Sequence, residues 1–295
     1  MIGTRRPYAV PRILCIFVLV PILIFFVVHV FEYTPWQRPH NVKQPQNVAH
    51  NTTIEKALVV VAKALKDIRW MHEVDPTWTR YTYLVTEDSL NPSSDISLSV
   101  PVNKGNEAMR YLSFIIDRYD TLPSIIAFRH GHDKSWHQQL HSATEINHLN
   151  LTTIRERGYQ NFRCTIFDGV HRHDCPDDQK DHLLHDGKTF WEGVEPETKD
   201  TYADNWDAWF GGPRPEYLMS ACCAQFVVTR ESVLRRPRDK YKEYRQFLID
   251  TDLHDYVAGR IFEKTWHVVF GMPPVSCETE EECMCEVYTP PLGCG

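Results

Sequence analysis

The sequence lacks the glycine-rich patterns by which the commonest nucleotide-dependent enzymes are identified. Its 295 residues include only 13 glycines, and these form no G-x-x-x-x-G-K-[ST] loop, no G-x-G-x-x-G fingerprint and no G-x-S-x-G elbow. The sequence therefore does not support a P-loop ATPase, a dinucleotide-binding dehydrogenase or an α/β-hydrolase.

A net basic charge is also absent. The 32 Lys and Arg residues are outnumbered by 39 Asp and Glu residues, which gives −7 at pH 7. The first thirty residues contain three Arg and no acidic residue, so the remainder carries 29 − 39 = −10. Nucleic acids are bound largely by neutralisation of their phosphates. We therefore expect no nucleic-acid partner.

A long uncharged run near the N-terminus predicts a membrane anchor. Ile13–Phe31 contains 19 residues without Asp, Glu, Lys or Arg. As a helix it would span roughly 28 Å, about the hydrocarbon thickness of a bilayer. A cleaved signal peptide is the alternative, but the run is long for one, and bulky Tyr33 and Trp36 follow it instead of small residues. We expect a cytosolic tail at 1–12, a signal anchor at 13–31 and a stalk at 32–56.

The arginines before the run predict a cytosolic N-terminus, and hence a single-pass type II membrane protein whose C-terminal domain lies in the lumen of the endoplasmic reticulum or Golgi. Asn51 and Asn150 begin N-glycosylation sequons, in agreement with a lumenal domain. Outside the anchor there is an even number of cysteines, which predicts disulfides in an oxidising compartment. These eight are Cys164, Cys175, Cys222, Cys223, Cys277, Cys283, Cys285 and Cys294.

The C-terminal cysteines offer two interpretations. A zinc site at Cys283-Met284-Cys285 is one, but C-x-C is not the usual C-x-x-C spacing of zinc knuckles. We favour a tail, residues 273–295, that is held by disulfides.

Strand-like and helical patterns alternate between residues 57 and 272, as is typical of an α/β domain. Asn106 is a suitable N-cap for the first helix. The segment of roughly 130–215 is less regular, and there we expect long loops with short helices. Apolar runs predict strands at 58–62, 80–86, 96–102, 124–128 and 218–229. Helical spacing of apolar residues predicts helices at 108–119, 239–248 and 254–270.

A histidine pair follows the strand expected at 124–128. His130 and His132 stand where this strand ends, and residues there point into the crevice where α/β sheets bind substrates. The imidazoles of an extended H-x-H share one face, so they would hold a divalent cation together with Asp133 or His137. The alternatives are an acid–base pair, or histidines that bond only to the backbone.

Two further groups of polar residues are candidates for a site. Arg260, Glu263 and His267 would lie on one face of the last helix, where the carboxylate would orient the imidazole. A solvated polar face is the alternative. Lys104 stands in a glycine-containing turn that leads into a helix beginning near Glu107, and such a turn is a natural anion-binding concavity.

Three blocks of the sequence resemble the fungal family called domain of unknown function 3431. They occur in the right order and cover most of residues 57–272. The blocks are Asn103–His137 (NKGNEAMRYLSFIIDRYDTLPSIIAFRHGHDKSWH), Cys222–Tyr241 and Gly259–Gly271.

The family pattern is similar to that of glycosyltransferases with a single mixed-sheet, nucleotide-sugar-binding α/β domain. By this likeness His130-Gly131-His132-Asp133 takes the place of the acidic metal motif of those enzymes, although imidazole suits Zn²⁺, Fe²⁺ or Cu²⁺ better than Mg²⁺. Glu263 would activate the acceptor and His267 would bind the metal or the diphosphate. Further substrate contacts would come from Lys104, Glu107, Arg129, Trp136 and Arg260.

We therefore expect a metal-assisted glycosyltransferase that uses a sugar nucleotide. A metal-dependent oxidative or cyclising enzyme of a fungal secondary-metabolite pathway is the alternative, suggested by the nine histidines between His130 and His185. A non-catalytic lumenal binding protein is a third, in which the aromatic segment Trp206–Phe210 would stack on sugars.

Overall fold

The structure, a computed structural model, describes residues 55–63, 65–85, 98, 100–136, 138–164, 196–215, 218, 220–221, 223–276 and 278–294. The expected anchor at 13–31, the expected stalk up to residue 54 and the Asn51 sequon lie outside these residues. Among the described helices, none has the length and apolar character that a membrane span requires.

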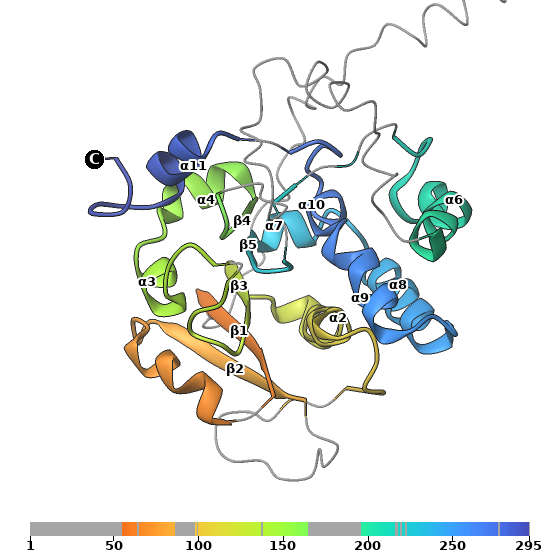
Figure 1. Cartoon of the computed structure of the whole chain (residues 1–295), viewed down its shortest axis with the longest axis horizontal. Helices are drawn as coiled ribbons and strands as arrows, with labels where there is room; N and C mark the ends of the chain where they lie inside the picture. The colour runs from red at the N-terminus through yellow and green to blue at the C-terminus, as the bar shows by residue number, and fades with distance from the viewer. Residues whose placement is uncertain are drawn as a thin grey trace, which may run out of the picture. The chain divides into compact units, whose positions relative to one another are not determined.

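A five-stranded mixed sheet runs through the domain in the order β2-β1-β3-β5-β4 (Figure 1). β1 pairs in parallel with both β2 and β3, whereas β5 pairs antiparallel with β3 and β4. The expected α/β class and mixed sheet are therefore confirmed. The strands are β1 Lys56–Ala62, β2 Trp78–Leu84, β3 Ile125–His130, β4 Tyr159–Asn161 and β5 Phe226–Thr229.

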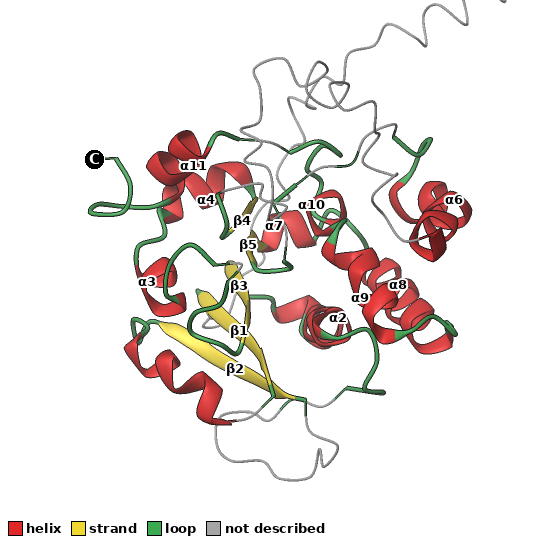
Figure 2. Cartoon of the chain, in the orientation of Figure 1, coloured by secondary structure: helices red, strands yellow, loops and turns green. Residues whose placement is uncertain are grey.

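Helices cover both faces of this sheet (Figure 2). One face, rich in aromatic rings, is covered by α2 Glu107–Asp117, α6 Pro196–Phe210, α7 Arg230–Val233, α8 Arg238–Asp250, α9 Asp255–Glu263 and α10 Trp266–Val269. The other is covered by η1 Leu65–Glu73, α3 Ser142–Asn147, α4 Leu151–Arg157 and α11 Glu280–Val287. A short turn, η2 Tyr119–Thr121, connects α2 to β3.

The alternation of side chains along β3 divides them between the two cores. Phe128 packs in the aromatic core, where its ring centroid lies 4.6 Å from that of Tyr111. Ala127 belongs to the opposite core. Because successive side chains of a strand point to opposite faces, His130 lies on the face that α2 covers and Arg129 on the other.

The last helix differs from the prediction. It ends at Glu263 and a separate short helix, α10, begins at Trp266. Thr265 leaves the helical region at φ −122° and ψ 1°, and its hydroxyl donates to the Ile261 carbonyl at 2.7 Å. A threonine that bonds back to the preceding turn competes with the helical ladder. The prediction that Glu263 and His267 lie on one face of a single helix is therefore wrong.

Several other boundaries also differ. The strand expected at 218–229 is reduced to β5, and residues 98 and 100 of the strand expected at 96–102 lie in no strand. Asn106 precedes α2, but its side chain makes no capping bond because its backbone adopts a positive φ of 52°. The aromatic segment Trp206–Phe210 belongs to α6, and both of its indoles are buried, so it does not offer them for stacking on sugars.

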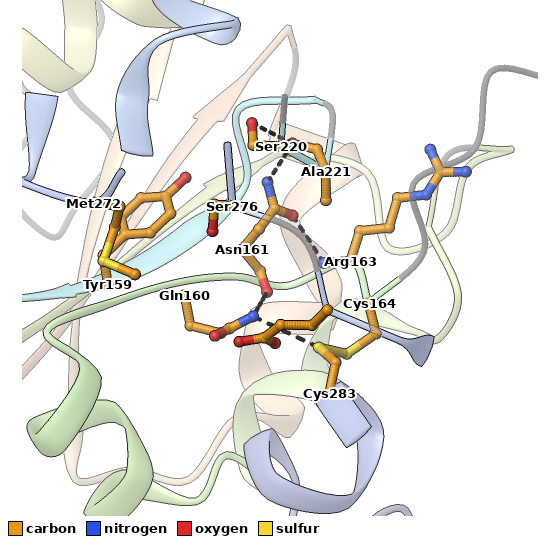
Figure 3. A pocket seen from close by; sticks show the side chains of 11 residues that line it. Tyr159, Gln160, Asn161, Arg163, Cys164, Ser220, Ala221, Met272, Ser276 and Cys283 are labelled. Atoms are coloured by element: carbon orange, nitrogen blue, oxygen red, sulfur yellow. Dashed lines mark hydrogen bonds between the residues drawn. A yellow bond between two sulfur atoms is a disulfide. The ribbon is translucent and has the colours of Figure 1, made fainter. Parts of the chain in front are cut away.

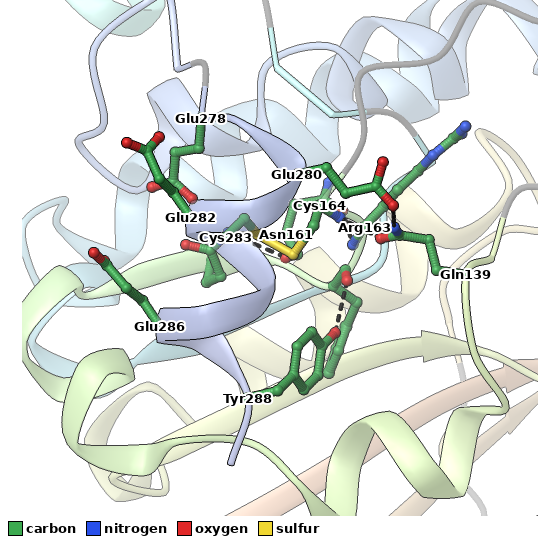
Figure 4. Close-up of a disulfide and its surroundings, with 12 residues drawn as sticks. Gln139, Asn161, Arg163, Cys164, Glu278, Glu280, Glu282, Cys283, Glu286 and Tyr288 are labelled. Atoms are coloured by element: carbon green, nitrogen blue, oxygen red, sulfur yellow. Dashed lines mark hydrogen bonds between the residues drawn. A yellow bond between two sulfur atoms is a disulfide. The ribbon is translucent and has the colours of Figure 1, made fainter. Parts of the chain in front are cut away.

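The C-terminal tail is held by disulfides, as expected. Cys164 is bonded to Cys283 in α11, and Cys285 is bonded to Cys294. Figure 4 shows how the first disulfide joins α11 to the chain beyond β4, close to the bond of 2.7 Å from the Tyr288 hydroxyl to the Phe162 carbonyl. The helix itself was not expected, although Thr279 and Glu282 form a capping box at its start.

Candidate functional site

The topology of the sheet points to one edge. From β1 the chain passes to β2 on one side and later to β3 on the other, so the strand order reverses between β1 and β3. Open α/β sheets bind ligands outside the carboxyl ends of the strands at such a switch point. Those ends are Ala62 in β1 and His130 in β3.

A glycine allows the two strand ends to approach each other. A Cβ atom on Gly131 would lie 2.4 Å from the Cβ atom of Ala62, closer than side chains tolerate. The Gly131 carbonyl also accepts a hydrogen bond of 2.7 Å from the Trp70 indole. The backbone that separates His130 from His132 is thus fixed against β1.

The structure brings the two histidines together. The ring centroids of His130 and His132 are 5.3 Å apart, at an angle of 73° between the planes. Within the described part of the chain, no group of three or more His, Cys, Asp or Glu side chains could hold a metal ion. His137, the expected third donor, lies outside the described residues. Asp133, the other expected donor, accepts a bond of 2.7 Å from the His141 ring.

Glu107 lies opposite His130 by the geometry of α2. This helix runs antiparallel to β3, because it forms the crossover between parallel strands. Two residues along β3 from Phe128 to His130 rise about 6.6 Å toward the carboxyl edge. One helical turn back, from Tyr111 to Glu107, rises about 6 Å in the same direction. Since the rings of Tyr111 and Phe128 are in contact, Glu107 and His130 stand at one level of the two layers.

A second carboxylate approaches Glu107 from α9. A Cβ atom on Gly259 would lie 3.0 Å from the Asn106 amide nitrogen and 3.2 Å from the Gly105 carbonyl oxygen, so α9 packs directly on the turn before α2. Glu263 follows Gly259 by one turn and shares its face. The two carboxyl groups are near enough that the charge of Glu263 raises the pKa of Glu107.

The Glu107 side chain is half-buried at the start of α2. Burial, with the smaller effect of Glu263, raises its pKa to about 7, against the influence of Arg110 and a backbone hydrogen bond. Near neutral pH this carboxyl is therefore divided between its protonated and ionised forms. A titratable group poised near the working pH is suited to general acid–base catalysis.

Four residues with positive φ angles lie at the same edge of the sheet. Gly105 and Asn106 have positive φ angles of 66° and 52°, immediately before α2. Cys223 and Ala224 have positive φ angles of 88° and 47°, shortly before β5, whose antiparallel direction brings its start to this edge. Non-glycine residues in this conformation cluster at binding and catalytic sites. The sequence gives no local signal for the second pair.

A match to a protein family agrees with the blocks named above. The model of the family described as Protein of unknown function (DUF3431) matches residues 58–286. The chain belongs to the DUF3431 family. No curated protein and no solved structure matches the chain.

Two basic residues of the DUF3431 domain that were expected to contact the substrate have partners in the protein. Arg129 is fully buried, paired with Glu145 and bonded to the Ser142 hydroxyl at 2.6 Å. The Lys104 ammonium donates to the Thr251 carbonyl. A ligand at this edge could therefore bind the Lys104 ammonium or the Arg129 guanidinium only in competition with these internal contacts.

The other predicted residues lie on different surfaces. Trp136 is 80% exposed, in the loop after His132. Arg260 lies over the ring of Tyr256, 3.8 Å from its centroid. Asn150 is half-buried and caps α4, because its side-chain oxygen accepts from the Thr153 amide at 3.4 Å.

His267 is an interior residue. It is 1% exposed, and its Nε2–H donates to the Pro274 carbonyl at 2.9 Å. Burial lowers its pKa to about 4, so the ring is neutral near pH 7. Its Nδ1 atom is buried without a hydrogen-bond partner among the described residues.

A pocket of the DUF3431 domain opens elsewhere, beside β4, with an empty volume of about 410 Å³ (Figure 3). Tyr159 lies at one end and the disulfide between Cys164 and Cys283 at the other. The amides of its wall bond to the protein itself: Asn161 donates to the Ala221 carbonyl at 3.0 Å and Gln160 to the Cys283 sulfur at 3.5 Å. None of the catalytic, substrate-binding or metal-binding residues predicted from the sequence lines this pocket.

Proposed function

We propose that the DUF3431 domain is a lumenal glycosyltransferase-like enzyme, tethered by the N-terminal apolar run, that transfers a sugar from a nucleotide sugar with the help of a divalent metal ion. The observation that best supports this proposal is the pair of imidazoles, His130 and His132, at the switch point of the sheet. Helix and strand geometry puts Glu107 at the same height along the sheet, and Glu263 lies near Glu107. The disulfides support an oxidising compartment.

The donor atoms are compatible with a metal. Two imidazoles whose centroids are 5.3 Å apart and whose planes are inclined can point their nitrogens at a shared ion. His130 and His132 would hold it, and a bound divalent ion would neutralise charge on the leaving diphosphate. Since Lys104 and Arg129 already have partners in the protein, this neutralisation falls mainly to the ion.

The carboxylates would serve the acceptor. Glu263 would take the proton of the acceptor hydroxyl while the oxygen of that hydroxyl bonds to the sugar carbon and the bond from this carbon to the diphosphate breaks. The nucleoside diphosphate leaves with the electron pair of that bond. Glu107, next to Glu263, would be only partly ionised near neutral pH, so the pair would carry less than two negative charges.

The test uses the full-length protein in detergent and a panel of nucleotide sugars, with Mn²⁺, Zn²⁺ or EDTA. We expect binding or slow hydrolysis of at least one donor, weakened at least tenfold by His130→Ala or His132→Ala. His72→Ala, which removes an exposed histidine of η1, is the matched control. Absence of binding and hydrolysis for every donor and metal would refute the proposal.

The nature of the ligand atoms favours one second candidate. Imidazole pairs are typical of zinc, iron and copper sites, whereas magnesium prefers oxygen. A metal-dependent oxidative or cyclising enzyme would use the same two histidines. Elemental analysis of the purified protein separates the two functions: one equivalent of iron or copper per chain supports this candidate, and metal-stimulated binding of a nucleotide sugar supports transfer.

A further inference from the structure

The backbone of His130 is held by a side chain that comes from the start of the next strand in the sheet. Phe128 of β3 pairs with Phe226 of β5. Two residues further along β3, this register would bring Ala224 opposite His130, but the positive φ of Ala224, 47°, is not a strand conformation. The side-chain oxygen of Gln225 takes the place of a strand carbonyl and accepts from the His130 amide at 3.2 Å.

Gln225 is itself fixed on two sides. It is 4% exposed, and its backbone carbonyl accepts from the Phe162 amide at 3.0 Å. Its backbone is therefore tied to the chain that follows β4, while its side chain reaches β3. A buried side chain with contacts in both directions has little rotational freedom, so its oxygen offers the His130 amide an acceptor in a fixed place.

The backbone that follows His130 is held from two other elements. The Gly131 carbonyl accepts from the Trp70 indole of η1 at 2.7 Å. Ser142, at the start of α3, is 0% exposed, and its hydroxyl lies 3.0 Å from the carbonyl oxygens of both His132 and Asp133, to which it donates. The Ser142 amide also donates to the Asp133 carbonyl at 2.9 Å. Each of the four residues from 130 to 133 thus has a backbone group bonded to another element.

The Ser142 hydroxyl is oriented by its own partners. It accepts from the Arg129 guanidinium at 2.6 Å and from the Gln138 amide at 2.9 Å. A hydroxyl has two lone pairs and one proton, so with both lone pairs occupied the proton is directed to the His132 and Asp133 carbonyls. Arg129 is in turn paired with Glu145. The backbone of His132 is therefore supported by a buried chain of polar contacts beneath the strand end.

We infer that Gln225 and Ser142 are positioning residues, which hold the backbone of the loop at 130–133 in one conformation before a ligand binds. The imidazoles of His130 and His132 are then prearranged for a shared ligand, and binding does not have to order the chain. Both positioning residues act through backbone groups of this loop, and neither is a ligand. The inference rests on the proposed function only where it takes the shared ligand to be a divalent metal ion.

Zn²⁺ and Co²⁺, each alone, are the probes, and their binding to the full-length protein in detergent is measured by titration calorimetry. Gln225→Met keeps the length of the side chain but removes the acceptor, and Ser142→Ala removes the hydroxyl. We expect each of these variants to bind the ions more weakly by on the order of tenfold or more, the effect typical of residues that support metal ligands. Gln225→Glu retains an acceptor oxygen and should keep most of the wild-type affinity.

A second measurement needs no metal. In protein stripped of metal with EDTA, NMR of the imidazole C–H groups reports the surroundings of each ring. We expect Gln225→Met to change the chemical shifts of the His130 ring and Ser142→Ala to change those of the His132 ring, because each ring moves with its backbone. His72 of η1, which is exposed, serves as the reference in the same spectra.

Gln160→Met is the control, because it removes another buried glutamine of the sheet, whose side-chain oxygen accepts from Arg157 at 2.7 Å. It should leave the metal affinity and both histidine signals unchanged. Wild-type affinity and chemical shifts in Gln225→Met and Ser142→Ala, equal losses in Gln160→Met, or a loss in Gln225→Glu as large as in Gln225→Met would overturn the inference. If the wild type binds neither ion, the metal of the proposed function is rejected, and the ring signals of the EDTA-treated protein still decide the positioning.

Discussion

Arg129 and Glu145 form an ion pair whose side chains are 0% and 2% exposed, beneath the strand end that carries His130. Arg129 also lies over the Phe162 ring, 4.5 Å from its centroid. Removal of one partner leaves the other charge buried and uncompensated, which costs about 3–5 kcal/mol.

We therefore expect Arg129→Met to lower the free energy of unfolding by about that amount, and the Arg129→Met, Glu145→Leu double variant to recover most of it. Urea unfolding followed by tryptophan fluorescence measures both. Arg155→Met is the control, because its pair with Glu55 is more than half exposed and should contribute less than about 1 kcal/mol. Similar losses for Arg129→Met and Arg155→Met would contradict this prediction.

Glu107 should make the fold less stable as the pH rises. Its pKa is raised from 4.5 to about 7, so the folded state holds the proton more tightly than the unfolded state. The stabilisation is fully present below pH 4.5 and is lost between pH 4.5 and 7, by about 1–3 kcal/mol. We expect Glu107→Gln to gain stability relative to the wild type above pH 7. Unfolding at a series of pH values measures this, and parallel curves for both proteins would exclude it.

His267 should have the opposite effect on the pH dependence of stability: it should make the fold more stable as the pH rises. Its pKa is lowered from 6.5 to about 4, so the unfolded state takes up the proton first as the pH falls. This stabilisation is present above pH 6.5 and is lost between pH 6.5 and 4. In the wild type the effects of Glu107 and His267 offset each other over most of that range.

The two variants should therefore separate the effects. Glu107→Gln should leave a stability that rises with pH from 4 to 6.5, on the order of 1 kcal/mol per pH unit. His267→Gln, which keeps a donor for the Pro274 carbonyl, should leave a stability that falls with pH from 4.5 to 7. The same slope of stability against pH in both variants would show that other titratable groups dominate the pH dependence of stability.

The elements that could be predicted from the sequence are those with a strong local pattern. The apolar run in β1 and the helical spacing in α2 identify both, since each buries almost every side chain of its pattern. β4 has only three residues, and it is a strand because it pairs with β5. No local preference of Tyr159–Asn161 indicates that pairing.

The same distinction holds for the candidate site. His130 and His132 could be placed at a strand end because they directly follow an apolar run in the sequence, and their spacing of two residues follows from the sequence alone. The approach of Glu263 to Glu107 depends on the packing of α9 against the turn before α2, which brings together distant parts of the chain. Gly259 allows that contact because a Cβ atom there would meet the Gly105 carbonyl, but a single sequence does not show which segment a glycine packs against.

The two described disulfides offer a further comparison, because they close loops of very different length. Cys164 and Cys283 are 119 residues apart, whereas Cys285 and Cys294 are 9 apart. In the chain-entropy model the longer loop stabilises the fold by about 5 kcal/mol and the shorter by about 3 kcal/mol. The longer one also holds α11 against the chain beyond β4, where the Tyr288 hydroxyl bonds to the Phe162 carbonyl.

We therefore expect the Cys164→Ala, Cys283→Ala variant to lose more stability than the Cys285→Ala, Cys294→Ala variant, by about 2 kcal/mol. Hydrogen exchange should also detect faster opening of Glu280–Val287 in the first variant, whereas the amides of β1 and β3 open only with global unfolding. Equal losses in the two variants, with unchanged exchange in α11, would mean that the ion pairs of Arg157 with Glu278 and Glu286 suffice to hold this helix in place.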